Sequence, residues 1–351
     1  MKKDYFKVFT NCQIVKGFTR GIIIDLQNQS YLYLPKLLIE VLEKTEQLSI
    51  EELIDSYDSM PNASEVIKSF LSQLSVKGYG FVTNKPENFP EIKWDFQSPY
   101  IISNAVIYFN DITNKNTLFQ QLSGMGTESI GFVLRKLSCE VVSEIHAKVK
   151  GKRFKSIQIF YENISDAYEN ILKIIPPLTP LLTHIFLFNC EESDVIKNNN
   201  VVIIKTKSPL SIIRETKSFS SPKNFAVNIM HFRESLRFNT FLNCKVAIDE
   251  DGEIKNAFNS NQSFGNISNN DIKSIVSTIG FQKHWFVHKG LIDVCKDCEF
   301  RHICSDNRIP KQRVDNTWYH ESECNYNPYI AKWSDEAGYK SVKESVMGFN
   351  I

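Results

Sequence analysis

The C-terminal part of the chain contains a dense group of cysteines, which constrains its fold more than any other feature. Four of the eight cysteines stand close together, at Cys295, Cys298, Cys304 and Cys324. The first three follow the spacing C-x2-C-x5-C, and the C-x2-C turn directs two sulfurs at one ion. Four thiolates form a tetrahedral set that suits one zinc ion or one [4Fe-4S] cluster. A chance group of buried thiols or a pair of disulfides is the alternative, and the local density of cysteine disfavours it.

Composition and charge indicate the number of domains, the partners that are disfavoured and the expected cellular compartment. The 351 residues predict two or three domains, and 42% of them are apolar. The formal net charge of +1, from 41 basic and 40 acidic residues, favours neither nucleic acid nor an anionic membrane. The N-terminus is too polar for a signal peptide, and no apolar run approaches the roughly 18 residues of a membrane span. We therefore expect a cytoplasmic protein, whose reduced thiols bind metal rather than form disulfides.

Residues 1–85 show a pattern that predicts a winged-helix-like α+β domain. Between Pro35 and Gly78 apolar residues recur at helical spacing, so we expect three helices there. Residues 86–100 contain three prolines and are an expected linker. The β-rich runs that flank the helices are Tyr5–Val15, Arg20–Asp25, Tyr31–Leu34 and Gly80–Thr83.

Residues 101–240 alternate between apolar strands and amphipathic helices. This alternation predicts an α/β fold with parallel β/α units, arranged as an open or partial barrel. The expected helices are Thr117–Leu122, Cys139–Val149 and Ala167–Ile175. The expected strands are Ile102–Tyr108, Ile130–Leu134, Ile157–Phe160, Ile185–Phe188, Val201–Ile204 and Phe225–Met230.

Short sequence motifs around the cysteines resemble those of a known family. They are DGEIKN (251–256), FGNI (264–267), CKDCEFRHIC (295–304) and ECNYNPYI (323–330), with NCQIVKGFTRGIIIDLQ (11–27) near the N-terminus. Together they resemble the SPASM-domain peptide maturase of grasp-with-SPASM systems, in which such a protein accompanies an ATP-grasp ligase and a short precursor peptide. The resemblance implies a degenerate radical-SAM-like β/α barrel over 101–240, a small cysteine-rich SPASM domain over 241–330, and a C-terminal tail over 331–351.

The chain departs from the family at one of its two cluster sites. A SPASM domain carries seven cysteines for two clusters. Here Ala257 replaces one ligand of the first cluster, Asn307 and Arg308 stand where another is expected, and Cys244 is its only remnant. The ligands of the second cluster match the four cysteines named above, and all four are present. The resemblance therefore implies one metal site.

The catalytic cysteines of the radical-SAM superfamily are missing. Its C-x3-C-x2-C motif follows the first barrel strand, whereas here Ile102–Tyr108 is followed by FNDITN, and the nearest cysteine is Cys139. Without those thiolates there is no reducing cluster to cleave S-adenosylmethionine. We therefore expect no S-adenosylmethionine cofactor and an accessory rather than a catalytic role.

The N-terminal domain is the expected site for the peptide. Similar small domains in peptide-maturation systems bind an extended leader segment against a strand edge and a helix. We expect the edge to be Arg20–Asp25, with Arg20, Ile22 and Ile24 contacting the peptide and the helix after Pro35 forming the other wall. A plain structural subdomain or a dimerisation unit is the alternative.

The sequence thus favours a leader-binding scaffold partner of an ATP-grasp ligase, which would form ester or amide links between side chains of the precursor peptide. One alternative is an iron–sulfur oxidoreductase that modifies peptides with the remaining cluster. Another is a zinc-stapled winged-helix regulator. His302 and His320 lie near the cysteines in sequence and are candidate donors to the sulfurs or, less favoured, replacement ligands.

Overall fold

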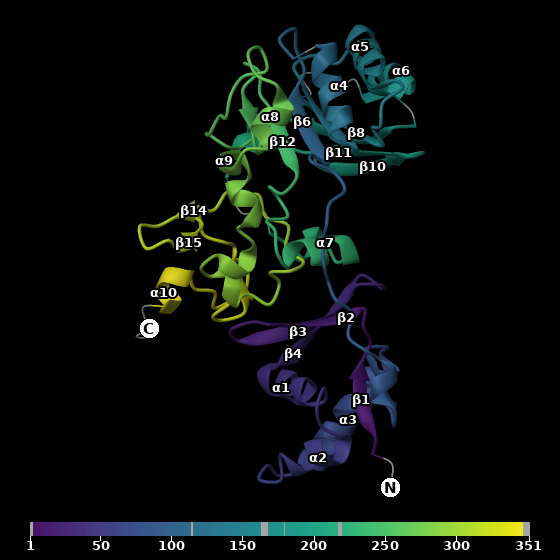
Figure 1. The fold of residues 1–351 in the computed structure, drawn as a ribbon. Helices are drawn as coiled ribbons and strands as arrows, with labels where there is room; N and C mark the ends of the chain where they lie inside the picture. Colours follow the sequence, from purple (N-terminus) through teal and green to yellow (C-terminus); the bar gives the residue numbers. More distant parts are fainter. Residues whose placement is uncertain (1–2, 114, 163–167, 179, 217–219, 347–351) are drawn as a thin grey trace. The chain divides into compact units, whose positions relative to one another are not determined.

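The structure is a computed structural model that describes residues 3–113, 115–162, 168–178, 180–216 and 220–346 (Figure 1). The chain forms two compact units. Unit 1 comprises residues 1–96, 217–240 and 287–351, and unit 2 comprises 97–216 and 241–286. The range 241–330, expected as one domain, is therefore divided between the two units.

Unit 2 is built on an eight-stranded sheet of order β10-β11-β9-β8-β7-β6-β12-β13. Neighbouring strands from β11 to β12 are parallel, whereas β10 and β13 pair antiparallel at the two ends. The strands are β6 (Asn104–Tyr108), β7 (Ser129–Leu134), β8 (Ser156–Glu162), β9 (Leu182–Phe188), β10 (Asp194–Asn198), β11 (Val201–Lys205), β12 (Lys245–Ile248) and β13 (Ile254–Lys255).

This sheet confirms the expected mixed α/β class with parallel β/α units, but not a barrel. Within the described residues its strand order is linear, with β10 and β13 as the end strands. The expected strand Phe225–Met230 is wrong. Asn228 instead caps α7 (Ile229–Ser235), because its side chain accepts a hydrogen bond from the His231 N–H.

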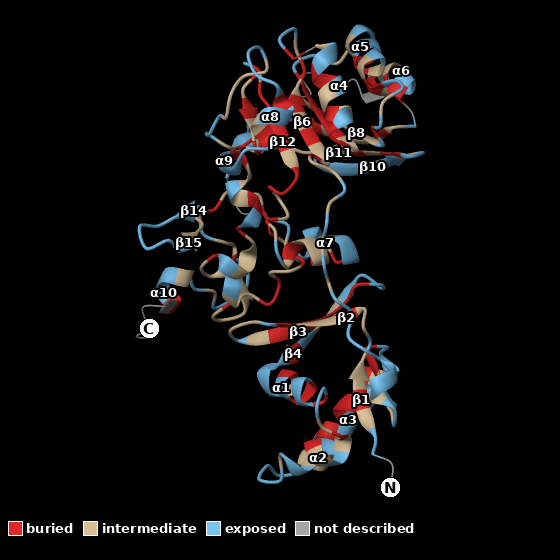
Figure 2. Ribbon diagram, in the orientation of Figure 1, coloured by how far each residue is buried: buried red, intermediate tan, exposed pale blue. Residues whose placement is uncertain are grey.

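The two faces of the sheet are covered differently. Successive residues of a strand point to opposite faces, so the contacts of Phe132 and Val133 of β7 show what covers each face. Phe132 contacts Phe119 of α4, with ring centroids 6.1 Å apart, so this face carries helices. Val133 packs with Phe258 and with Leu210 of the short 3₁₀ helix η3. Figure 2 shows the buried residues running along the strands between these layers.

The helical elements of unit 2 agree with the expected positions after β6, β7 and β8, although Ala167, the expected start of the third helix, lies outside the described residues. They are α4 (Asn116–Gly124), α5 (Cys139–Val149), α6 (Tyr168–Ile174), η2 (Pro176–Leu178), η3 (Leu210–Arg214), α8 (Ile272–Val276), α9 (Ile279–Gln282) and η5 (Lys283–Phe286).

The N-terminal part of unit 1 contains a three-stranded antiparallel sheet of order β2-β3-β4, a two-stranded sheet of β1 and β5, and three helices. The order of strands, three helices and a last strand is the one the sequence predicted, but the expected run Tyr5–Val15 is divided into β1 and β2, which lie in different sheets. The elements are β1 (Tyr5–Val8), β2 (Cys12–Lys16), β3 (Arg20–Asp25), β4 (Ser30–Pro35), α1 (Lys36–Lys44), α2 (Ile50–Asp55), α3 (Ala63–Val76), β5 (Gly80–Thr83) and η1 (Pro86–Asn88).

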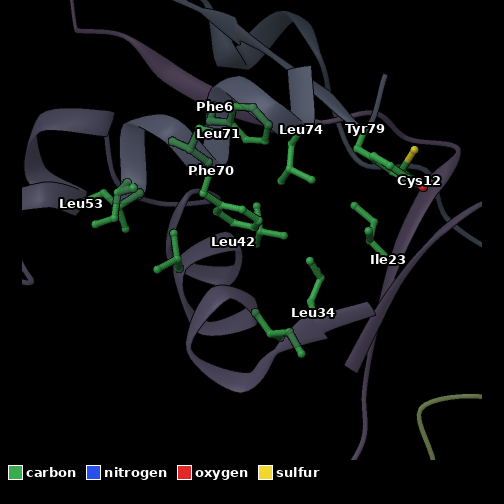
Figure 3. Close-up of a cluster of buried hydrophobic side chains, with 13 residues drawn as sticks. Phe6, Cys12, Ile23, Leu34, Leu42, Leu53, Phe70, Leu71, Leu74 and Tyr79 are labelled. Carbon is green, nitrogen blue, oxygen red and sulfur yellow. The ribbon is translucent and has the colours of Figure 1, made fainter. Parts of the chain in front are cut away.

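Figure 3 shows the apolar core of this part of unit 1. Leu71 and Leu74 of α3 lie one turn apart, so they face the sheet together. They share the core with Phe6 of β1 and Ile23 of β3. Cys12 is 3% exposed in this core, where burial raises the pKa of its thiol to about 12, so it packs as a small apolar side chain.

The C-terminal part of unit 1 consists of short elements joined by irregular chain. The expected tail 331–351 contains a strand and a short helix up to its last described residue. The elements are η4 (Pro222–Asn224), η6 (Lys289–Leu291), η7 (Cys295–Asp297), β14 (Lys311–Gln312), β15 (Trp318–Tyr319), β16 (Tyr326–Asn327), β17 (Lys332–Trp333) and α10 (Val342–Val346). Across the described part of the chain, every helix is too short or too polar to cross a membrane.

Candidate metal centre

The structure brings the four predicted cysteines into one neighbourhood of unit 1. Cys295 begins η7 and Cys298 caps its end, where the Cys298 N–H donates to the Cys295 carbonyl at 3.1 Å. Cys298, Cys304 and Cys324 pack against a shared cluster of buried side chains that includes Phe300. Their role as metal ligands stays a prediction.

Polar groups already face two of the sulfurs. The Tyr326 N–H donates to the Cys324 sulfur at 3.4 Å, and the Ser220 hydroxyl lies 3.1 Å from the Cys304 sulfur. N–H and O–H donors of this kind stabilise thiolates more than thiols, because a thiolate is the stronger acceptor. These contacts therefore suit sulfurs that carry negative charge.

Without a metal the buried thiols keep their protons. Burial raises the pKa of Cys295 to about 12 and that of Cys304 to about 11, and raises the pKa of Cys298 well above its usual range. A cation must therefore displace the protons when it binds, and its binding free energy contributes to folding.

Two cations offset the negative charge that four thiolates would bring. The Arg308 guanidinium, with 5% of its side chain exposed, pairs with Asp306 at 2.7 Å and lies 3.9 Å from the Cys295 sulfur. Burial opposes the charge on Lys289, yet Cys304, Asp306 and Cys295 outweigh it and raise the pKa of this amine. Because Asp306 offsets only one of the two cations, the site suits an anionic metal centre.

A carboxylate and an imidazole lie close to one of the cysteines. In the described chain, one group of Cys, His, Asp or Glu has its ligand atoms within 4.8 Å of one another: Cys295, Asp306 and His320. Asp306 and His320 therefore offer two further candidate ligand atoms beside the Cys295 sulfur.

The two histidines near the cysteines differ in their surroundings. His320 Nε2 lies 3.8 Å from Asp306, and its buried Nδ1 has no hydrogen-bond partner among the described residues. Burial and Arg308 lower the pKa of His320 to about 3, so its ring is neutral. His302 instead lies 3.0 Å from the Ser235 hydroxyl and packs on Phe232. His320 is thus the histidine that the structure places beside the cysteines.

The β2–β3 turn of the N-terminal sheet forms hydrogen bonds with the C-x2-C segment and with the chain near Cys324. The C-x2-C segment, Cys295–Cys298, is called the knuckle below. The Phe18 N–H donates to the Asp297 carbonyl at 2.7 Å, and the Thr19 hydroxyl donates to the Pro328 carbonyl at 2.8 Å. A Cβ on Gly17 would come within 2.9 Å of the Glu299 nitrogen, so this close approach requires glycine.

A buried ion pair strengthens this contact. Arg20 Nε donates to Glu299 Oε1 at 2.8 Å, and the Tyr326 hydroxyl donates to the same oxygen at 2.5 Å. Glu299 is 0% exposed and directly follows Cys298. The Arg20 guanidinium also lies over the Tyr33 ring, 3.9 Å from its centroid.

The expected peptide edge at Arg20–Asp25 is wrong. β3 is the central strand of its sheet and pairs with β2 on one side and β4 on the other. Ile22 and Ile24 are 0% exposed and pack in the same cluster as Phe300. The run of hydrophobic residues in β3 therefore reflects a strand buried on both faces, and the free edges of this sheet are β2 and β4.

The outer edge of β2 borders a groove. Gly17 and Asn11 form backbone hydrogen bonds with the β3 side, so by alternation the N–H and C=O of Ile14 point outward. The groove has a volume of about 340 Å³. Its lining includes β2, the end of α1 and the 89–94 segment, with Glu46 and Glu91 among its residues. Burial and Glu91 raise the pKa of Glu46, so these carboxylates repel each other.

Sequence reasoning missed Asp306, Lys289 and Glu299. Arg308 was noticed only as a substitution for a cysteine. A signal for them existed, because charged residues inside a buried cysteine motif require partners. The identity of those partners depends on tertiary contacts that spacing alone does not give.

Comparisons with known proteins do not show the family of this chain. No family model matches the chain, and no curated protein matches it. Two crystal structures of Streptococcus suis SuiB, one bound to S-adenosylmethionine and one to precursor peptide SuiA, share 11% and 10% identity with it. Each covers 85% of this chain and 94% of its own, with TM-scores of 0.28 and 0.27. Such low scores carry no argument, so function must be inferred from the residues of this chain.

Breaking the buried ion pair should destabilise unit 1. Arg20→Met leaves the Glu299 carboxylate buried without its cation, which should cost about 3 kcal/mol of unfolding free energy. The double variant with Glu299→Gln should recover most of this loss, because the neutral amide oxygen at this position still accepts a hydrogen bond from Tyr326. Chemical denaturation followed by circular dichroism measures both.

The control is Lys311→Met, which breaks an ion pair with Glu321 whose side chains are 52% and 71% exposed. It should cost less than about 1 kcal/mol. If Arg20→Met lowers the unfolding free energy no more than this control does, the Arg20–Glu299 pair does not hold β3 against the segment that contains Cys298.

Proposed function

We propose that the chain is a peptide-binding partner in the maturation of a ribosomally made precursor peptide. The observation that carries this proposal is the groove beside the free edge of β2, in the same compact unit as the four-cysteine site. A free strand edge next to a helix accepts an extended peptide through backbone hydrogen bonds. The chemistry of maturation, ester or amide bond formation between side chains, would belong to an ATP-grasp ligase.

The leader segment would occupy the groove in extended form. Its backbone would pair with the outward N–H and C=O of Ile14, and an apolar side chain would lie against Phe9 and Phe89, which are 37% and 45% exposed. A lysine or arginine of the leader would relieve the repulsion between Glu46 and Glu91. Lys7 also lines the groove and partly offsets the charge at Glu46, so a leader with an apolar and a basic residue would fit this groove.

The four cysteines would hold one [4Fe-4S] cluster or one zinc ion. The residues fit such a group, because the thiols converge and Lys289 and Arg308 offset the thiolate charge. The bound group would tie the knuckle to the segment around Cys324 and, in the case of a cluster, would also accept one electron. The chain's own contribution is to position the sulfurs and to exclude water from them.

The sheet of unit 2 would serve as a scaffold. The loop after β6, where a radical-SAM enzyme carries its cysteines, is closed by its own polar groups: the Thr113 hydroxyl donates to the Tyr108 carbonyl at 2.7 Å, and Asn110 Nδ2 donates to the Glu250 carbonyl at 2.8 Å. Leu210 and Phe258 pack over the adjoining face of the sheet. These contacts support a role without S-adenosylmethionine.

A peptide-modifying iron–sulfur oxidoreductase is the second candidate, and the cation beside the Cys295 sulfur favours it, because such charges tune electron transfer. A zinc-stapled winged-helix regulator is less favoured. The helix α3 has one lysine and no arginine, so it lacks the basic stripe of a DNA-reading helix.

Loss of one ligand should remove the metal. Cys298→Ser should abolish stoichiometric zinc or iron in anaerobically purified protein and should lower the melting temperature, because structural metal sites contribute on the order of 10 kcal/mol to folding in small domains. Metal analysis and thermal denaturation measure these effects. Cys139→Ser, on the exposed face of α5, is the matched control and should keep the metal. A metal-free wild type would end the proposal of a metal centre.

Peptide binding should depend on the edge of β2. Ile14→Pro removes an outward N–H without breaking the β2–β3 ladder, so it should weaken binding of a fluorescently labelled leader segment at least tenfold by anisotropy. Ile14→Val is the control and should bind normally. Unchanged affinity of a folded Ile14→Pro protein, checked by circular dichroism, would exclude this edge.

Glu46→Gln should act on binding and stability in opposite directions. The folded-state pKa of Glu46 is raised, so its ionised form destabilises the fold above that pKa, and the neutral variant should melt slightly higher at pH 7. The same variant should bind a basic leader more weakly. A leader whose lysines and arginines are replaced by glutamine should show no difference between the two proteins.

Unit 2 should not catalyse the reductive cleavage of S-adenosylmethionine. Incubation with S-adenosylmethionine and dithionite should release no 5′-deoxyadenosine above the reagent blank, measured by liquid chromatography. The reason is that the loop after β6 has no thiolate to hold a reducing cluster. Turnover would overturn the scaffold role.

A further inference from the structure

The position where the SPASM pattern loses a cysteine carries a cation that faces the remaining site. Arg308 is buried, and its Nη2 points to the Cys295 sulfur at 3.9 Å. Its Nη1 donates to the Ser322 carbonyl at 2.8 Å, two residues before Cys324. The guanidinium therefore links two of the four cysteine segments and places a positive charge beside one sulfur.

An anion lies on the same side of the site. Asp306 accepts from Arg308 Nε at 3.0 Å and from Nη2 at 2.7 Å, with 1% of its side chain exposed. Its carboxylate oxygen also lies within 4.8 Å of the Cys295 sulfur. Two fixed charges of opposite sign thus stand within reach of the same ligand atom, with Lys289 as a further cation near Cys304.

From this geometry we propose that Arg308 and Asp306 are positioning residues that set the reduction potential of a [4Fe-4S] cluster at the four cysteines. The inference rests on the proposed metal site and goes beyond it, because a purely structural ion needs no such tuning. A cluster with four thiolates carries a net charge of about −2, which becomes more negative when it accepts one electron, so nearby cations favour the reduced form.

The two residues should shift the potential in opposite directions. Removing the cation disfavours the reduced cluster and lowers the midpoint potential, whereas removing the anion raises it. The hydrogen-bond geometry adds to the first effect, because a donor to a ligand sulfur stabilises the additional charge. A change in packing alone does not predict opposite signs for two neighbouring residues.

The experiment uses the full chain, purified anaerobically and titrated with dithionite, which supplies one electron to the cluster with no bond made or broken. Midpoint potentials are read by absorbance and electron paramagnetic resonance. We expect a lower midpoint for Arg308→Gln, a higher one for Asp306→Asn and an intermediate value for the double variant. Arg313→Gln is the control, since this arginine is 42% exposed and pairs with Asp293, and it should leave the midpoint unchanged.

The outcomes separate this inference from the proposed metal site. The inference is overturned if the midpoint potentials of Arg308→Gln and Asp306→Asn equal that of the wild type or shift in the same direction. The proposed cluster is not affected by this outcome. Stoichiometric zinc without iron overturns it too and leaves the four-cysteine site intact. Protein without any metal refutes the site itself. If Arg308→Gln does not retain iron, Asp306→Asn still gives the sign of the effect, and a midpoint that does not rise in this variant overturns the inference.

Discussion

The buried carboxylate of Glu299 is the group on which the organisation of unit 1 depends. A fully buried charge is stable only with a partner, and its partner is Arg20 from β3, 279 residues away in the chain. Because Glu299 directly follows Cys298, the pair fixes the central strand of the N-terminal sheet to the C-x2-C knuckle. The knuckle and the sheet therefore support each other, and neither segment has its charges satisfied alone.

Through this coupling, a metal at the four cysteines would affect residues beyond its own ligands. The Phe18 N–H, the Thr19 hydroxyl and the Arg301 guanidinium all bridge the β2–β3 turn and the cysteine-containing segment. β2 has this turn at one end and the groove along its outer edge. A metal that ordered the knuckle would therefore also order the strand on which the proposed peptide site is built, and Trp94, which lines the groove, packs against the same buried cluster as three of the cysteines.

The sequence predicted local structure well where periodicity and turns decide it. The β/α units around β6, β7 and β8, and the strands and helices of the N-terminal part, follow apolar spacing and capping residues such as Ser49 and Glu52, which form a capping box at the start of α2. The sequence could not predict which strand is an edge. Ile22 and Ile24 satisfy the pattern of an edge strand and that of a central strand equally, and only the pairing of β3 with both β2 and β4 distinguishes the two.

The sequence predicted the group of four cysteines but not the charged residues around them, and the role of the cysteines as metal ligands stays a prediction. Cysteine spacing is local information, whereas the partners of Arg308 and Lys289 come from the tertiary fold. Two positions at which the sequence resemblance led us to expect cysteine are filled differently in the structure. Ala257 is 7% exposed and packs as an apolar residue in unit 2, whereas Arg308 brings a charge that Asp306 must satisfy. The Arg308–Asp306 pair therefore places a buried charge 3.9 Å from the Cys295 sulfur, whereas an apolar residue such as Ala257 brings none.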